Sequence, residues 1–246
     1  MHRSKVAFGA ALKQDAPIYD LRSTMLVTLT ILKFAPGDRY RAFANMGRWL
    51  MKPFDVAGLG FQKMMGTGKN FGFIPDFSQY VFLGVWTGEA AANAFFSSAA
   101  WQPFLPKNPL GISTVYLRPF KSHGLWDGVN PFTPDKALPP PDPAAPVAVL
   151  TRANIRPGAL LDFYRNIPQA RQRIAEQGDN LLLAMGVGEK PLVQQCTISI
   201  WKNAALVDQF AYRQSGHREI VKKTRDRQWY SEELFARFAV LRMEGF

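Results

Sequence analysis

The sequence predicts an α+β protein in which the second half of the chain repeats the first. Two observations support this: strand-like and helix-like segments recur in the same order in both halves, and a proline-rich stretch lies between them. Composition is a third, because 246 residues with 47% hydrophobic and 20% charged residues can bury a large core. Each half is expected to run strand, helix, strand, strand, helix, strand (βαββαβ).

Each half opens with a strand-like run that ends at a Pro-Gly pair, and a helical pattern follows. Proline and glycine end regular structure, so the pair marks the same boundary in both halves. The opening runs are Met25–Phe34 and Val147–Arg156, and the helices expected after them are Arg39–Met51 and Ala159–Ala175.

The rest of each half also recurs at matching points. A Gly-x-Gly triplet ends the second strand-like stretch, an apolar run ending in Trp forms the third, a helical segment with a phenylalanine follows, and a short strand comes last. Matches in one order favour a repeat over two unrelated α+β stretches. The matching pairs are Gly66–Gly68 with Gly186–Gly188, Tyr80–Trp86 with Gln195–Trp201, Phe95 with Phe210, and Tyr116–Arg118 with Val240–Arg242.

These matches predict the domain boundaries. Residues 1–24 form an N-terminal extension, residues 25–130 the first unit, residues 131–146 a linker and residues 147–246 the second unit. The linker contains Pro139-Pro140-Pro141 and is expected to be a stiff, extended spacer. In each unit both helices should cover one face of a four-stranded antiparallel sheet. The bare faces of the two sheets should then pack against each other as a barrel-like core.

Charge and cysteine content indicate which cellular compartment and which classes of binding partner to expect. Cys196 is the single cysteine, so no internal disulfide can form and a reducing cytoplasm is expected. The net charge is +11, and residues 1–69 hold 11 Lys/Arg against 4 Asp/Glu. This balance fits either an anionic partner, such as a membrane surface, or a solvated basic surface. No nucleic-acid motif accompanies it, and no apolar run is long enough for a membrane-spanning helix.

Several common kinds of active site have no motif in this sequence. It shows no zinc-ligand spacing, no Walker loop, no dinucleotide fingerprint and no nucleophile elbow. His217 shares one face of a predicted helix with Ile220 and Val221. An inward histidine of this kind is either a hydrogen-bonded core residue or a metal ligand. One axial histidine suffices for haem, whereas zinc needs three or four protein ligands, so haem is the metal cofactor that best suits the chain.

Three arginines and the cysteine lie within strand-like runs. Arg118, Arg152 and Arg242 point either outward to solvent or inward, where a guanidinium could pair with a haem propionate or an oxygen-derived ligand. Cys196 alternates with isoleucines, which favours a buried, inert thiol over a thiolate ligand.

Five stretches of the sequence carry a resemblance to a known family. They are Leu150–Ala153, Gly186–Glu189, Thr197–Trp201, Ala211–Arg213 with His217, and Trp229–Phe238. These residues resemble the spheroidene monooxygenases, a family of carotenoid oxygenases, and the Ser122–Gly128 loop is similar to the Gly/Trp loop of that family. The resemblance runs from about Met25 to the C-terminus and is densest from Leu150 onward.

The resemblance implies a fold similar to the dimeric α/β barrel, here two ferredoxin-like units packed sheet to sheet, with haem b in the C-terminal unit. His217 would be the ligand of the haem iron, and Ile220 and Val221 would lie beside it in the cofactor site. Arg152 and Arg118 are the candidates for a catalytic arginine that stabilises negative charge on bound oxygen.

The implied reaction inserts oxygen at an end of an acyclic carotenoid. It would use O2, an apolar substrate and an external electron donor such as a ferredoxin. Two alternatives stand beside it: a haem-dependent lyase of the aldoxime dehydratase type, and a non-catalytic α/β barrel that binds a small apolar ligand. The expected setting is the cytoplasm, with peripheral contact at the inner membrane face, an oligomeric state still open, and no nucleic-acid partner.

Overall fold

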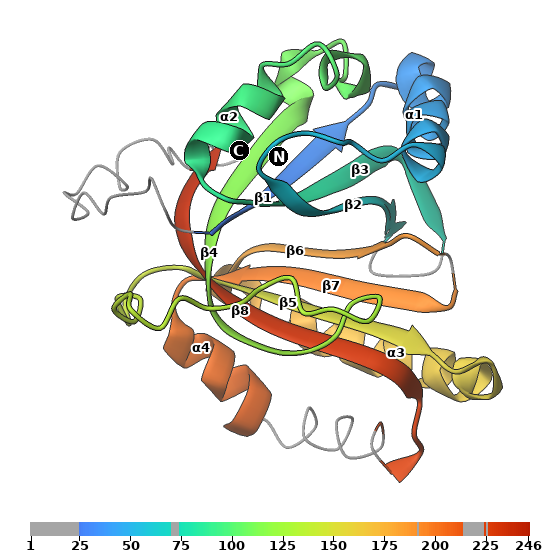
Figure 1. Cartoon of the computed structure of the whole chain (residues 1–246). Coiled ribbons are helices and arrows are strands. Elements are labelled where there is room, and N and C mark those ends of the chain that lie inside the picture. Colours follow the sequence, from blue (N-terminus) through green and yellow to red (C-terminus); the bar gives the residue numbers. More distant parts are fainter. Residues whose placement is uncertain (1–24, 70–73, 191, 214–223, 225) are drawn as a thin grey trace, which may run out of the picture.

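The described residues form eight antiparallel strands that close into a barrel, and the helices lie outside it (Figure 1). The computed structural model describes residues 25–69, 74–190, 192–213, 224 and 226–246. The first half contains β1 (Leu26–Lys33), α1 (Arg39–Met51), β2 (Leu59–Gly68), β3 (Pro75–Trp86), α2 (Glu89–Phe96) and β4 (Ile112–Gly124). The second contains β5 (Val147–Ile155), α3 (Leu160–Ala175), β6 (Leu181–Gly188), β7 (Gln194–Trp201), α4 (Ala204–Asp208) and β8 (Tyr230–Glu244).

The order of the elements follows the prediction, and the α+β class is confirmed. α1 spans the predicted residues, and α3 begins one residue later than predicted. Pro36 and Pro157 lie in short 3-10 turns that lead into these two helices. Proline is tolerated there because the first N–H groups of a helix have no partner within it. Among the described residues, no helix is both long and apolar enough to cross a bilayer.

Closure of the barrel joins the two halves by backbone hydrogen bonds as well as by packing. The strand order around the barrel is β1-β3-β2-β6-β7-β5-β8-β4. The Gly-x-Gly triplets meet at one seam, where Gly66 of β2 pairs with Gly188 of β6. The matched short strands meet at the other, where Tyr116 of β4 pairs with Arg242 of β8. The sequence predicted only face-to-face packing of two sheets; pairing at both seams also leaves no open sheet edge.

The inside of the barrel is filled by apolar side chains that alternate along the strands. Val27, Leu29 and Ile31 of β1 point inward and are at most 2% exposed. The intervening side chains point outward, as the two-residue period of a strand requires. All eight strands contribute to this interior core.

The segment between β4 and β5 closes one end of this core. Trp126 is 1% exposed and Phe132 is fully buried, and both belong to the interior core. Phe132 packs edge-on against Phe238 of β8, with ring centroids 5.0 Å apart. We call residues Leu125–Phe132 the plug. The predicted spacer, residues 131–146, therefore contributes a core side chain in addition to linking the halves.

Aromatic packing seals the outer face of the strands of the first half, β1 to β4. α1, α2 and the segment after α2 cover it, and Phe82 stacks on Phe95 with ring centroids 5.6 Å apart. Beneath this layer Thr30 of β1 is 1% exposed, and its hydroxyl lies 3.2 Å from that of Thr114. The buried hydroxyls thus satisfy each other.

Candidate active site

The strands of the second half have an exposed side chain at the centre of their outer face, unlike the strands of the first half. Thr151 lies in the middle of β5 between Thr197 of β7 and Phe235 of β8, yet its side chain is exposed. Thr30 of β1 lies as far before Pro36-Gly37 as Thr151 lies before Pro157-Gly158, and Thr30 is only 1% exposed. Helices packed on a sheet normally cover a central strand. The exposure of Thr151 therefore distinguishes this part of the outer face, and we call the region around Thr151 the open face.

A buried arginine borders the open face. Arg237 of β8 pairs with Val149 of β5, points outward with it, and is 6% exposed. Its Nη1 lies 2.8 Å from Oδ1 of Asp208 in α4, and its guanidinium lies 5.7 Å from the ring centre of Phe235. Its Nε is buried and has no hydrogen-bond partner among the described residues. A buried donor is costly to leave unpaired, so this one is suited to an anionic group of a ligand.

The side chains around Arg237 are mostly apolar. Val149 and Trp201 are buried, and Phe210 and Phe235 pack against them. The rings of Trp201 and Phe210 are 5.1 Å apart, and His123 of β4 stacks on Phe235 at the same distance. A haem has an apolar macrocycle and anionic propionates, so an apolar wall with one available arginine donor fits it.

The chain segment that leads to the predicted haem ligand starts on this side of the sheet. α4 packs on the outward residues of β5 and β7 and continues as a π-helical turn, Gln209–Arg213. Such turns are frequent at functional sites. His217, Ile220 and Val221 lie outside the described residues. Their roles as iron ligand and cofactor contacts stay predictions.

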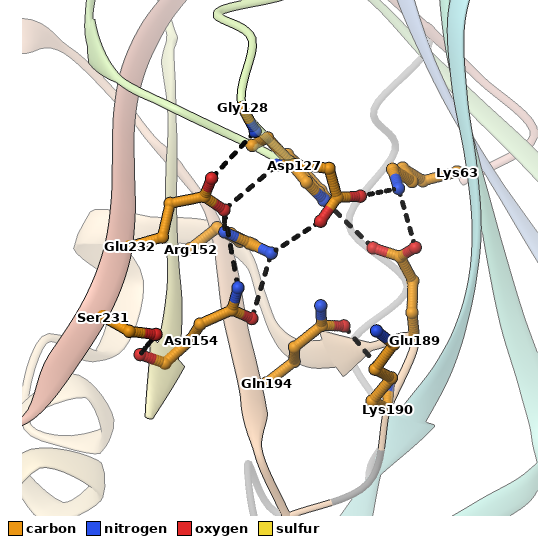
Figure 2. Close-up of polar contacts among 11 residues, drawn as sticks. Lys63, Asp127, Gly128, Arg152, Asn154, Glu189, Lys190, Gln194, Ser231 and Glu232 are labelled. Atoms are coloured by element: carbon orange, nitrogen blue, oxygen red, sulfur yellow. Dashed lines mark hydrogen bonds and ion pairs between the residues drawn. The ribbon is translucent and has the colours of Figure 1, made fainter. Parts of the chain in front are cut away.

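Arg152 points to the opposite side of the sheet, into the barrel (Figure 2). It directly follows Thr151 in β5, and neighbouring side chains of a strand lie on opposite faces. Its guanidinium donates hydrogen bonds to Glu232 of β8, to Asp127 of the plug at 3.2 Å and to Asn154 at 3.0 Å. Of the two orientations that the sequence left open for Arg152, outward to solvent or inward, the structure shows the inward one. Its catalytic role stays a prediction.

Lys63 extends this group of charges across the barrel. Lys63 of β2 donates hydrogen bonds to Asp127 and, at 2.8 Å, to Glu189 (Figure 2). Trp126 donates from Nε1 to the other oxygen of Glu189 at 3.0 Å. Asp127 thus links a cation of the first half to Arg152 of the second. We call the five charged residues Lys63, Asp127, Arg152, Glu189 and Glu232 the plug cluster.

These contacts keep two carboxylates of the plug cluster ionised. Burial alone would raise the pKa of Glu232, but the N–H groups of Gly128 and Asp127, together with Arg152, outweigh it and lower the pKa. Burial would likewise raise the pKa of Asp127, and Lys63, with help from Arg152, lowers it instead. The plug cluster holds three carboxylates for two cations. It is therefore suited to holding the plug in place rather than to binding an anionic ligand.

Two other residues singled out by the sequence have different surroundings. Arg118 of β4 donates a hydrogen bond to the carbonyl of Pro139 at 3.4 Å, and its catalytic role also stays a prediction. Cys196 is 2% exposed in the interior core, and burial raises the pKa of its thiol, which agrees with a protonated, inert group. Within the described ranges, no group of three or more His, Cys, Asp or Glu residues could hold a metal ion.

Arg237 and the partners of Arg152 in the plug cluster were not predicted from the sequence, for different reasons. Arg237 lies within the stretch Trp229–Phe238, and strand alternation with the inward Ala236 and Phe238 could have placed it on the outer face. No sequence pattern brings Lys63 to Asp127, because the contact joins residues far apart in the chain.

The sequence is similar to three proteins named spheroidene monooxygenase. It is 32% identical over 194 residues to that of Rhodobacter capsulatus, covering 78% of this chain and 79% of that protein. The protein of Cereibacter sphaeroides is 36% identical over 226 residues, which cover 87% of this chain and 66% of that protein. The protein of Rubrivivax gelatinosus is 29% identical over 239 residues, which cover 96% of this chain and 90% of that protein. No family model matches the chain.

Two solved structures of aldoxime dehydratase have a similar fold. One, in complex with butyraldoxime, gives a TM-score of 0.57 at 12% identity, covering 90% of this chain and 81% of that chain. The other gives a TM-score of 0.56 at 12% identity, covering 93% of this chain and 89% of that chain. At this level of identity the likeness shows a shared fold and carries no activity with it.

Proposed function

The chain belongs to the spheroidene monooxygenase family, and we propose on that premise that it is a haem-dependent oxidoreductase inserting oxygen at an end of an acyclic carotenoid or a similar apolar chain. Membership makes it an oxidoreductase of the monooxygenase class. The observation that carries the haem proposal is the open face at Thr151, bordered by the buried Nε of Arg237.

We infer that the two halves are repeated ferredoxin-like units in a dimeric α/β barrel arrangement. The same order of elements in both halves supports this inference, as does the meeting of matched motifs at both seams. Haem b would belong to the second unit. The contrast between sealed Thr30 and exposed Thr151 favours that unit, because only an open sheet face leaves room for a cofactor.

Haem b, when bound, supplies the iron chemistry that activates O2. His217 would hold the iron, and Ile220 and Val221 would pack beside it. Arg237 would donate a hydrogen bond from Nε to a propionate, because that donor is buried without a partner among the described residues. The apolar wall around Arg237 would exclude water and favour an apolar substrate.

Two further arginines have proposed roles. Arg152 stays the first candidate for stabilising negative charge on bound oxygen. Its hydrogen bond to Glu232 also supports a positioning role, because it ties β5 to β8, the two strands that carry Thr151 and Arg237. Arg118 stays a second candidate for stabilising negative charge at the site. Each oxygen atom inserted requires one O2, two electrons and two protons, and the other oxygen atom leaves as water. An external donor such as a ferredoxin would deliver the electrons.

The proposed setting is the cytoplasmic side of a membrane that stores the apolar substrate. The net charge of +11 supports contact with anionic lipid. No nucleic-acid partner is proposed. Oligomeric state is a separate property that sedimentation would measure.

The absorption spectrum of the purified protein tests the haem proposal. Protein from haem-supplied cells should show an intense Soret band, and His217→Ala should shift or abolish it. Thr151→Trp should lower the haem content without changing the far-ultraviolet circular dichroism, because it fills the open face without touching the core. His123→Ala is the matched control, since this histidine stacks on Phe235 beside the open face, and it should keep the band.

Two results would contradict these assignments. Loss of the band in His123→Ala but not in His217→Ala would move the iron ligand to His123. Absence of a Soret band in the wild type would overturn haem dependence and favour a non-catalytic barrel that binds a small apolar ligand.

The demand for O2 and electrons separates oxygenation from dehydration. With an acyclic carotenoid in detergent micelles and a reduced ferredoxin, O2 uptake should rise in proportion to oxygenated product. A lyase of the aldoxime dehydratase type consumes neither O2 nor external electrons. Conversion of an aldoxime to a nitrile without O2 uptake would replace the oxygenase proposal by the lyase.

A further inference from the structure

Helix α1 carries an apolar stripe that faces solvent, in addition to the face that packs on the barrel. The inner face contributes Ala42 and Trp49, which are 2% and 5% exposed. The solvent-facing side chains are Tyr40 and Met51, each 83% exposed, Phe43 at 57% and Leu50 at 55%. At about 3.6 residues per turn, these four positions fall within an arc of roughly 100°.

The start of β3 extends this stripe into a patch. The ring of Phe43 contacts that of Phe77 edge-on, with centroids 6.0 Å apart. Phe77 is 50% exposed, and Ile74, just before the strand, is 57% exposed. Single exposed apolar residues are ordinary, but neighbouring ones on one surface mark an interaction site. We call Tyr40, Phe43, Leu50, Met51, Ile74 and Phe77 the apolar patch.

Basic side chains flank the apolar patch on both edges of α1. At the same helical spacing Arg39 lies at one edge of the stripe, and Arg48 and Lys52 lie beyond the other. All three are exposed and form no salt bridge with another described residue. Residues 33–52 hold five Lys/Arg and one acidic residue, Asp38, which is 8% exposed and pairs with Lys107 at 3.2 Å.

We propose that α1 and the start of β3 dock on an anionic membrane surface. The apolar patch would enter the boundary between headgroups and acyl chains, and the basic residues would contact lipid phosphates. A helix with an apolar stripe flanked by Lys and Arg lies in the plane of a bilayer interface. Arg and Lys extend their stems along apolar surface while their charges reach the headgroups, and tyrosine is favoured at that level.

Charge complementarity selects the membrane over a second copy of the chain. Two α1 helices placed together would oppose like charges, which disfavours the contact, whereas anionic lipid attracts them. This inference rests on the proposed function only for the location of the substrate in a membrane. It names the surface that makes the contact, and it does not depend on haem.

Sedimentation with lipid vesicles tests the docking surface without measuring activity. The wild type should pellet with vesicles that contain about one third phosphatidylglycerol at low salt, and binding to pure phosphatidylcholine should be at least about tenfold weaker. Raising the salt to about 0.5 M should weaken binding, because surface charges are screened.

Two triple variants separate the apolar and the basic contributions. Phe43→Ser with Leu50→Ser and Met51→Ser should weaken vesicle binding at least about tenfold. Arg39→Gln with Arg48→Gln and Lys52→Gln should do the same on anionic vesicles. The matched controls change other exposed residues and should bind as the wild type does. They are Leu110→Ser with Leu161→Ser, and Lys121→Gln with Lys136→Gln and Lys202→Gln.

Three outcomes would overturn the proposal. The first is a wild type that stays in the supernatant with anionic vesicles at low salt. The second is equal loss of binding in the controls and in the α1 variants. The third is self-association in sedimentation velocity, abolished by the apolar triple variant, without any vesicle binding. None of these results bears on the Soret band, so failure here and failure of the haem proposal are distinguishable.

Discussion

At the scale of single residues, burial and partners decide the role of each charged side chain. The side chain of Arg152 is 1% exposed and pairs with Glu232 and Asp127, whose side chains are 20% and 46% exposed. Arg237 is comparably buried but has one carboxylate partner, Asp208, and it borders the open face. Each arginine has a buried Nε without a partner among the described residues, so the two differ in their surroundings: Arg152 lies among the carboxylates of the plug cluster, and Arg237 lies beside the open face.

Arg152→Gln should lower the free energy of unfolding by about 3 kcal/mol, at the lower end for a broken buried ion pair because both carboxylate partners are partly exposed. Urea denaturation followed by tryptophan fluorescence measures it. Arg39→Gln, which alters an exposed arginine, should stay within about 0.5 kcal/mol of the wild type. Equal effects of the two variants would remove the structural role of Arg152.

At the scale of elements, the two halves of the chain differ most in the plug and in the cover of their outer sheet faces. The plug inserts Trp126 and Phe132 into the interior core, and the plug cluster holds it there. Aromatic packing seals the outer face around Thr30, while the outer face around Thr151 is open. The strand β1 thus lies under a sealed surface, and β5 carries a candidate site.

Trp126→Ala should cost about 3–5 kcal/mol of stability, because it removes a large buried side chain and leaves a cavity in the barrel. Thermal or urea unfolding measures this loss. Leu125→Ala, at a neighbouring plug residue that is 45% exposed, should cost less than about 1 kcal/mol. A Trp126→Ala variant as stable as Leu125→Ala would show that the plug contributes little to the core.

At the scale of the whole molecule, both seams of the barrel are paired and one interior core fills it, so the two halves are expected to unfold together. β4 and β8 pair along most of their length, and β2 and β6 pair through two residue pairs at the other seam. Lys63, Asp127 and Arg152 add an ionic link between the halves. Stability should therefore depend on the charge state of the plug cluster as well as on the apolar core.

Acid should weaken the barrel through Asp127 and Glu232. Their folded-state pKa values lie below the ordinary values of 3.8 and 4.5, so the stability they contribute is complete above those values and is lost as pH falls through the folded pKa values. The free energy of unfolding in urea should thus fall as pH drops below 4.5 and level off above it. Asp127→Asn should flatten this profile; an unchanged slope would contradict a stabilising role for that carboxylate.

Local patterns in the sequence determined the order of the elements, the bounds of α1, the start of α3 to within one residue, and the burial of Cys196. Helix and strand periodicity, and the Pro-Gly pairs, depend on neighbouring residues only, so the sequence contains them directly. The family resemblance pointed to the monooxygenase relatives for the same reason, since its motifs are short.

Tertiary structure alone decided the closure at both seams, the partners of Arg152 and the contrast between two matched threonines. Thr30 and Thr151 have the same side chain at the same distance from a Pro-Gly pair, yet one is sealed and the other exposed. Their exposure depends on which distant helices and aromatic side chains pack over each strand. Contacts between residues far apart in the chain determine that packing, and no local pattern encodes them.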